Sequence, residues 1–224
     1  MTPIEKAKVE QPVATEMPAA AEGAPSTTKR DAIISAGTRV FMEQGFEPAS
    51  MDEIARLAAV SKATIYSHFE SKQALFDSVV TNRCQALHAV FAEPSLDDRP
   101  PAEALTLIGQ RFLDLLVSPG SLSFYRLVVG ESVRFPELGR AFYNAGPNRV
   151  AGALADYLAR QHERGTLHVP EPRRAAEQFL GMVMGHLHLR TLLAVSAEPP
   201  SPEDRARNVA NAVRIFLDGT ARKP

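Results

Sequence analysis

The dominant pattern in this chain is apolar residues spaced three or four positions apart, and no stretch alternates between apolar and polar residues as a β-strand would. In the first half this spacing predicts helices over residues 28–44, 50–58, 61–69 and 71–91. Gly45 follows the first helix as a stop signal, and Ser50 with Glu53 three residues later is a capping-box pattern that opens the second. The expected fold class is all-α.

The second half of the chain continues the helical pattern. It predicts helices over residues 105–117, 122–135, 135–165, 173–196 and 203–218. The helix over 135–165 is expected to be interrupted before Pro147, because the proline ring cannot continue a regular hydrogen-bond ladder. The helix over 173–196 is apolar on nearly every face, which is typical of a helix buried on two sides.

Residues 1–26 lack this periodicity. They mix Pro, Ala, Glu and Thr and cannot bury enough apolar area to offset the entropy cost of ordering, so we expect a disordered tail. The rest of the chain is expected to divide into a three-helix unit over 27–83 and a larger helical unit over 84–224.

Charge narrows the range of functions. The net charge is −1, and residues 27–83 carry seven basic and seven acidic side chains. Binding of nucleic acid through net positive charge alone is therefore excluded. Any binding of nucleic acid must come from a few specific side-chain contacts.

The remaining composition indicates a reducing, aqueous compartment. Cys84 is the single cysteine, so no intrachain disulfide can form, and its apolar neighbours favour a core position over a redox-sensing role. No apolar run is long enough to span a membrane and the N-terminus lacks the apolar block of a signal peptide, so we expect a cytoplasmic protein with no membrane partner.

Residues 50–69 have the spacing of a helix-turn-helix motif. Ala55 is small where the two helices would cross, Val60 would fill the turn, and Ile65 and Phe69 would anchor the second helix. The positions left facing outward are Lys62, Ala63, Thr64, Tyr66, Ser67 and His68. Hydroxyl, tyrosine and histidine groups can donate hydrogen bonds to phosphates, a lysine can reach a guanine edge, and methyl groups can meet the methyl of thymine.

The segment from residue 28 to about residue 83, and above all "VSKATIYSHFESK" over 60–72, resembles the DNA-binding domain of TetR-family transcriptional regulators. The resemblance implies that Lys62, Ala63 and Thr64 face bases, while Ser50, Tyr66, His68 and Lys72 contact phosphates. The full set of candidate DNA-binding residues is Ser50, Ser61, Lys62, Ala63, Thr64, Tyr66, Ser67, His68 and Lys72. One position departs from the family pattern, since the turn usually carries glycine where this chain has Ala59, and an alanine there costs stability if the backbone is left-handed.

The string "FYRLVVGESVRFPELGRAFYNAGPNRV" resembles the C-terminal domain of the AefR-like subgroup of the TetR family, over about residues 105–216. This resemblance implies a ligand-binding and dimerisation domain with a cavity for a small effector, in which the helices over 173–196 and 203–218 form a homodimer. Two recognition helices about 34–36 Å apart would then reach successive major grooves of palindromic double-stranded DNA.

The candidate effector contacts are the aromatic and polar side chains of the second unit. They are Phe112, Phe124, Arg126, Glu131, Arg134, Phe135, Phe142, Tyr143 and His186. His186 and His188 are two residues apart on a helix and point to different faces, so we expect no metal site, and no cofactor motif is present.

Three functions follow from these patterns. The first is a repressor released from its operator by a small, largely apolar effector, and the second is a DNA-binding regulator without such an effector. The third, an all-α enzyme, has no phosphate loop, nucleophile elbow or "HExxH" motif to support it, so we expect no enzymatic activity.

Overall fold

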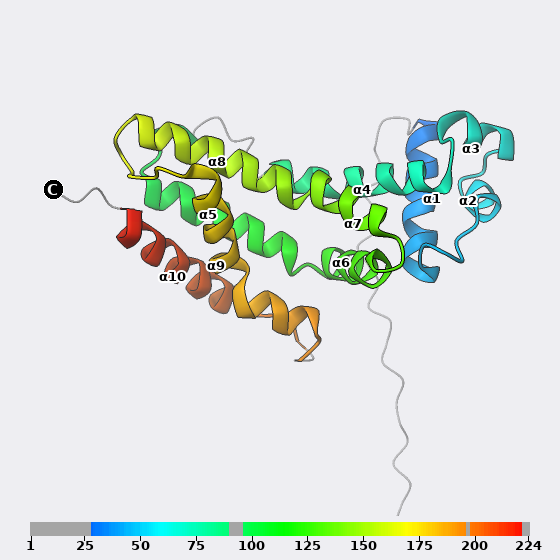
Figure 1. Cartoon of the computed structure of the whole chain (residues 1–224). Coiled ribbons are helices and arrows are strands. Elements are labelled where there is room, and N and C mark those ends of the chain that lie inside the picture. Colours follow the sequence, from blue (N-terminus) through cyan, green and yellow to red (C-terminus); the bar gives the residue numbers. More distant parts are fainter. Residues whose placement is uncertain (1–27, 90–95, 196–197, 221–224) are drawn as a thin grey trace, which may run out of the picture.

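The computed structural model describes residues 28–89, 96–195 and 198–220, and all regular secondary structure within these ranges is helical, which confirms the all-α class (Figure 1). The helices are α1 (Lys29–Gln44), α2 (Met51–Leu57), α3 (Lys62–His68), α4 (Lys72–Ala89), η1 (Leu96–Asp98), α5 (Pro101–Leu116), α6 (Pro119–Ser132), α7 (Pro136–Ala145), α8 (Pro147–Glu163), α9 (Pro172–Leu192) and α10 (Pro202–Thr220). The tail expected over residues 1–26 lies outside the described residues.

Hydroxyl side chains begin the first three helices. The Thr28 hydroxyl accepts a hydrogen bond from the Asp31 amide, and the Asp31 carboxylate accepts one from the Thr28 amide, which forms a complete capping box. The Ser50 hydroxyl accepts from the amide of Glu53 at 3.1 Å. The carboxylate of Glu53 does not return to Ser50 but accepts from the Gln44 side chain at 2.9 Å, so the capping box expected there is only half formed.

Proline begins each helix from α5 to α10. A proline at the first helical position loses nothing, because its missing N–H would have no partner in the helix and its fixed φ angle is already helical. α5 and α6 begin at Pro101 and Pro119, earlier than the expected residues 105 and 122. The expected starts were too late because the prolines were interpreted as parts of loops. The expected interruption before Pro147 is confirmed, since Gly146 has non-helical φ and ψ angles of −113° and −90°.

The helix expected over 173–196 is kinked. Gly185 has φ 38° and ψ −148° inside α9, and the helix ends at Leu192. Since only glycine adopts such a conformation without strain, the kink follows from the residue present at this position.

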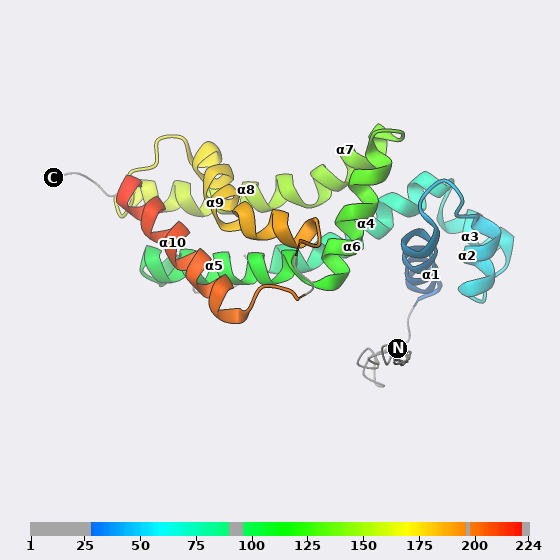
Figure 2. The ribbon, with the colours of Figure 1, turned by 90° about the horizontal axis from the view of Figure 1, so that it is seen from below.

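The helices form an elongated molecule with α1–α3 at one end and α5, α8, α9 and α10 at the other (Figures 1 and 2). α4 runs from the first end into the second and passes residue 83, so one helix belongs to both expected units. α8 packs along α9, and α10 packs along α5. The two ends share one continuous hydrophobic core, which includes Ile33 of α1 and Phe216 of α10.

Close packing of α5 against α10 depends on a small residue. A Cβ added to Gly109 would lie 2.9 Å from Cγ1 of Val209.

Within the described residues no single helix is long and apolar enough to cross a membrane. The pair α5 and α6, bent by 68°, has the length and composition of a broken span only when the two helices are taken together.

The turn between α2 and α3 generates a stability prediction. Ala59 has φ 53°, the left-handed conformation that costs an L-residue roughly 1–2 kcal/mol. Ala59→Gly removes that strain but adds backbone entropy to the unfolded chain. We therefore expect a net gain of about 0.5–1 kcal/mol in the free energy of unfolding, measured by denaturant titration.

The matched control is Ala58→Gly in the same turn. Ala58 has φ −77°, so glycine there relieves no strain and should lower the free energy of unfolding. Equal effects from both substitutions would show that the backbone at Ala59 is not strained.

Candidate nucleic-acid interface and adjoining cavity

α2 and α3 form a compact helix-turn-helix. Ile54 of α2 and Ile65 of α3 are fully buried, and the amide of Val60 in the turn donates to the carbonyl of Ala55 at 3.0 Å. This packing fixes α3 at the far end of the molecule with one long side facing solvent. The apolar anchors and turn residues therefore have the roles that their spacing predicts.

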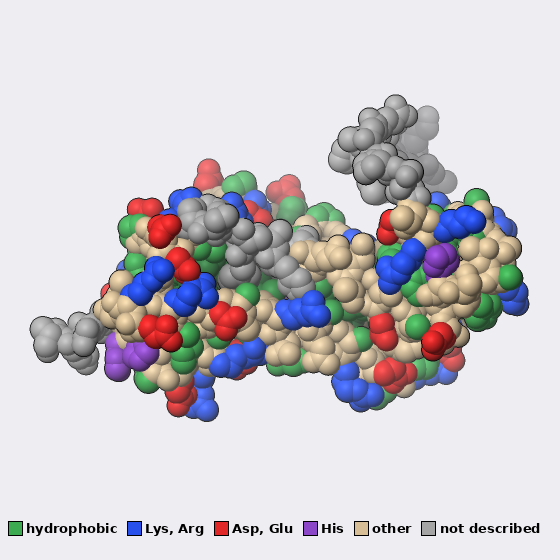
Figure 3. Space-filling view, turned by 90° about the horizontal axis from the view of Figure 1, so that it is seen from above, with side chains coloured by type: hydrophobic (Ala, Val, Ile, Leu, Met, Phe, Trp, Pro, Cys, Tyr) green, Lys and Arg blue, Asp and Glu red, His purple; other side chains and the backbone are tan. Residues whose placement is uncertain are grey.

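The solvent-facing side of α3 carries most of the predicted DNA contacts. Lys62, Ala63, Tyr66, Ser67 and His68 are exposed, and Tyr66 is 45% exposed although its ring is large and apolar. Figure 3 shows Lys and Arg side chains around a histidine on this end of the molecule. An exposed tyrosine and histidine beside cations can donate hydrogen bonds to a phosphate backbone.

The serine and threonine hydroxyls of the predicted interface already have partners. The Ser61 hydroxyl caps α3 by accepting from the Thr64 amide at 3.1 Å, and it lies 2.8 Å from the Thr64 hydroxyl. The Ser67 hydroxyl donates to the carbonyl of Thr64 at 2.8 Å, and the Ser50 hydroxyl caps α2. These four residues shape the helix ends, and a role in DNA binding stays a prediction for each.

Lys62 lies at the first position of α3 and pairs with Asp52 of α2. Its Nζ is 2.8 Å from Oδ1 and 3.0 Å from Oδ2 of that carboxylate. The hydrogen bond and charge of Asp52 raise the pKa of the Lys62 ammonium. Both side chains are well exposed, so the pair is weak and the lysine can exchange this partner for an acceptor on DNA.

Lys72 is turned inward against the loop between α1 and α2. Its Nζ donates to the carbonyls of Glu47 and Ala49 at 2.7 and 3.0 Å, and it lies 4.8 Å from the centre of the Phe46 ring. Burial lowers the pKa of this ammonium, and the charge of Glu131 opposes that effect. In this structure Lys72 holds the loop between α1 and α2 in place. Its contact with a DNA phosphate stays a prediction.

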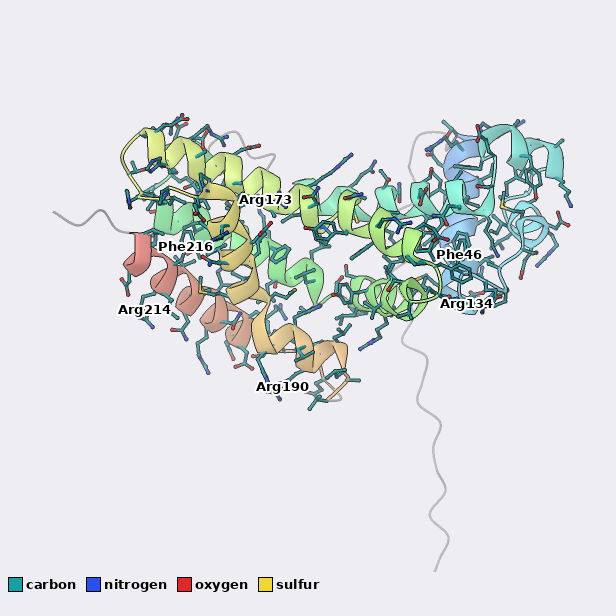
Figure 4. The ribbon with its side chains drawn as sticks, in the orientation of Figure 1. Phe46, Arg134, Arg173, Arg190, Arg214 and Phe216 are labelled. Carbon is teal, nitrogen blue, oxygen red and sulfur yellow. The ribbon has the colours of Figure 1, made fainter. Side chains whose placement is uncertain are left out.

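The same loop meets the corner between α6 and α7, and we call this contact the junction. It consists of Phe46, Glu47, Glu131, Arg134 and Phe135. The amide of Phe46 donates to the Glu131 carboxylate at 3.0 Å, Arg134 pairs with the carboxylate of Glu47, and the rings of Phe46 and Phe135 are 5.1 Å apart. Figure 4 places Phe46 and Arg134 side by side where the two ends of the molecule meet.

A cavity of about 210 Å³ lies between α4, the end of α5, the start of α6, α7 and α9. It is lined by Arg83, Cys84, Leu115, Leu116, Ser118, Gly120, Ser121, Phe124, Tyr125, Phe142 and His188. The larger hollows along α9 and α10 are more open to solvent than this cavity. A mostly apolar cavity with a few polar groups has the character of a small-molecule site.

Comparison with known proteins identifies the family. Residues 33–79 match the family described as "Bacterial regulatory proteins, tetR family", and residues 103–219 match "AefR-like transcriptional repressor, C-terminal domain". The chain belongs to the TetR family of transcriptional regulators. Together the two matches cover the helix-turn-helix and nearly all of the helical bundle from α5 to α10.

Individual TetR-family relatives agree with this assignment. A regulator named SrpR from Pseudomonas putida is 33% identical over 100 residues, which is 45% of this chain and 45% of SrpR, so the match spans less than half the length of that relative. The structure of the "Flavonoid-responsive Regulator FrrA" is 35% identical, covers 88% of this chain and 98% of its own, and superimposes with a TM-score of 0.78. A TetR-family regulator from Mesorhizobium loti is 27% identical, with 86% and 96% coverage and a TM-score of 0.75. These relatives are regulators of transcription and not enzymes, in agreement with the expectation for this chain.

The predicted effector contacts fall in several places within this TetR-family fold. Phe124 and Phe142 line the cavity together. Glu131, Arg134 and Phe135 lie at the junction instead, and Arg126 donates to the last carbonyls of α9, those of Thr191 and Leu192, at 2.9 and 2.8 Å. Phe112 is buried in α5 outside the lining, and Tyr143 is half exposed to solvent.

The two histidines of α9 point to different faces, as predicted. The cavity is lined by His188 and not by His186, which was the predicted effector contact. His188 is 5% exposed and lines the cavity, whereas His186 faces the hollow between α9 and α10. Arg83 and Tyr125 also line the cavity, although neither was among the predicted effector contacts. The available signal was that Arg83 and His188 are polar residues beside apolar positions of α4 and α9.

Cys84 lies in the cavity wall and is buried. Burial raises the pKa of its thiol to about 11, and the nearby Arg149 opposes that effect only in part. The thiol is therefore protonated at neutral pH and is a poor nucleophile, as a core cysteine would be.

The ion pair between Asp52 and Lys62 generates a prediction for DNA binding. Asp52→Asn removes a negative charge from the interface and frees Lys62, so operator affinity should rise about threefold. The plot of log affinity against log salt concentration should also steepen by about one. Fluorescence anisotropy on labelled DNA at several salt concentrations measures both quantities.

Glu43→Gln is the control. It removes the same charge from the same end of the molecule, where Glu43 pairs with Arg39 on α1 at 2.9 Å. An equal rise in affinity from the two variants would mean that net charge is responsible and that Lys62 has no special part.

Proposed function

We propose that this TetR-family regulator is a homodimeric repressor that binds a palindromic operator through α3 and is released by a small, largely apolar effector bound in the cavity. The observation that carries the proposal is that the cavity and the junction share helices. α6 contributes Phe124 and Tyr125 to the cavity and Glu131 to the junction. α4 contributes Arg83 to the cavity and Lys72 to the loop of the DNA-binding end.

The exposed face of α3 supports the DNA-binding part of the proposal. Lys62 and Ala63 lie in its first turn, the part of a recognition helix that meets base edges, and Tyr66 and His68 lie farther along the same helix. The candidate base contacts are thus Lys62, Ala63 and Thr64, and the candidate phosphate contacts are Tyr66 and His68.

Apolar residues on α9 and α10 support a homodimer. Leu189 and Ile215 are 46% and 52% exposed, and Leu193 and Val195 are exposed just after α9. Figure 4 shows Arg190 and Arg214 projecting on the outer side of the same two helices. Exposed apolar side chains rimmed by charged ones are typical of a protein interface, and two copies are needed to read a palindrome.

Release by a small effector is supported by the cavity and by the relatives. The matched C-terminal family is described as a repressor domain, and the name of FrrA describes a response to flavonoids, which are aromatic molecules. The aromatic side chains in the cavity wall suit such ligands. Because the DNA that it would bind lies in the cytoplasm, we also propose that the protein acts there.

The testing experiment is anisotropy of the full chain on the DNA upstream of its own gene, against scrambled DNA at one salt concentration. We expect wild type to prefer the native sequence. Lys62→Ala should reduce that preference, because it removes a base contact, whereas Tyr66→Phe should weaken binding to both sequences alike, because it removes a phosphate contact.

Two other outcomes would contradict parts of the proposal. Sequence preference that survives in Lys62→Ala would remove its base-reading role. Preference that no aromatic compound ever reduces would favour a DNA-binding regulator that has no small-molecule effector.

A further inference from the structure

Two polar groups in the cavity wall lack partners. Only 5% of the His188 surface is exposed to solvent, and neither of its ring nitrogens has a hydrogen-bond partner. The Nε atom of Arg83 is also buried without one. Unsatisfied buried polar groups are costly and are expected to have a reason. Since both side chains line one cavity, a ligand that pairs with both is such a reason.

Arg83 places an uncompensated positive charge in the cavity wall. Among the described residues that line the cavity, none is acidic. The guanidinium lies 5.6 Å from the centre of the Phe124 ring, so one side of its plane faces an aromatic ring while its edge carries the N–H donors. A carboxylate is the group that best satisfies such an edge, through two parallel charge-assisted hydrogen bonds.

The start of α6 lies beside the same guanidinium. A Cβ added to Gly120 would be 3.4 Å from Nη1 of Arg83, which puts the arginine next to the first turn of this 14-residue helix. A helix N-terminus carries partial positive charge and free N–H groups. The helix therefore adds to the attraction that Arg83 exerts on an anion.

Aromatic rings form another part of the wall. The ring centres of Phe124 and Phe142 are 6.1 Å apart, and Tyr125 meets Phe142 edge to face at 5.7 Å. His188 meets Tyr125 edge to face at 5.5 Å. A further ring placed in the cavity would extend this cluster in the arrangement that aromatic pairs prefer.

His188 selects a hydroxyl group on that ring. Burial lowers its pKa, so the imidazole is neutral at pH 7 and presents one donor and one acceptor. A hydroxyl group also donates one hydrogen bond and accepts others, and it therefore matches a neutral imidazole without bringing a charge into a buried position.

The volume limits the size of the ligand. About 210 Å³ is below the roughly 300–1,000 Å³ of sites for drug-sized molecules. It suits one aromatic ring with a short substituent better than a fused system of several rings.

We propose that the effector is a single-ring hydroxylated aromatic carboxylic acid, whose carboxylate pairs with Arg83, whose ring packs against Phe124 and Phe142, and whose hydroxyl group bonds to His188. This inference rests on the proposed function and narrows its largely apolar effector to an aromatic ring that carries one carboxylate and one hydroxyl group. The acid binds from water as its carboxylate, and no covalent bond forms or breaks.

The test is isothermal titration calorimetry of the full-length protein with 4-hydroxycinnamate, its methyl ester, cinnamate and a three-ring polyphenol. We expect wild type to bind 4-hydroxycinnamate at least about tenfold more tightly than the ester, because the ester cannot form the charged pair with Arg83. Cinnamate, which lacks the hydroxyl group, should bind more weakly than 4-hydroxycinnamate. Equal affinity for acid and ester, or binding of the polyphenol alone, would overturn the proposal.

Variants assign the two contacts. Arg83→Gln should cost about tenfold in affinity for the acid and leave ester affinity unchanged, while His188→Phe should abolish the preference for 4-hydroxycinnamate over cinnamate. Arg126→Gln is the matched control, since Arg126 also lies on this part of the molecule but its guanidinium donates to α9 and does not line the cavity. An Arg126→Gln variant that loses the acid as strongly as Arg83→Gln would overturn the assignment. If Arg83→Gln does not fold, the comparison of acid and ester on wild type still decides.

Operator release separates this inference from the proposed function. A protein that leaves its operator with another aromatic compound, but does not bind 4-hydroxycinnamate, retains the function and loses the ligand class. A protein with no operator preference at all loses the proposed function, whatever the cavity binds.

Discussion

The architecture depends on the junction, where the loop after α1 meets the corner between α6 and α7. The amide of Phe46 has its partner there in Glu131, 85 residues away in sequence. Gly45 permits this approach, because it has φ 89° and a Cβ on it would lie 2.8 Å from Oε1 of Glu131. The Phe46 ring then packs on Phe135, and the ion pair of Arg134 with Glu47 adds a second polar link. These contacts fix where α2 and α3 lie relative to the bundle.

In the proposed function, this linkage would carry a change at the cavity to the DNA-binding end. α6 is both a wall of the cavity and one side of the junction, and α4 runs from the loop of the DNA-binding end to the cavity. Since packed helices move as rigid elements, the proposed effector, bound between Phe124 and Phe142, would change the position of α6 at Glu131 as well. In a dimer with two recognition helices, a small change in this position alters the spacing that both grooves require.

Much of the fold could be predicted from the sequence because its signals are local. Thr28, Ser50 and Ser61 cap helices through residues three positions away, and the spacing of Ile54 and Ile65 shows which faces pack. The cavity could not be predicted in the same way. Glu131, Arg134 and Phe135 were expected to contact an effector, but their partners lie on a loop more than 80 residues earlier in the chain. His186 and His188 lie on different faces of α9, and their spacing alone does not show which of the two faces meets the cavity.

The most direct measurement of the junction's role is operator affinity after exchange of the charges of Glu47 and Arg134. Glu47→Arg and Arg134→Glu change net charge in opposite directions, yet each places like charges together and should weaken operator binding several-fold. The double variant restores the pair with the charges reversed and should recover most of the wild-type affinity. If the single variants instead follow net charge, so that Glu47→Arg strengthens binding, or if the double variant recovers nothing, the junction does not hold the DNA-binding end in place.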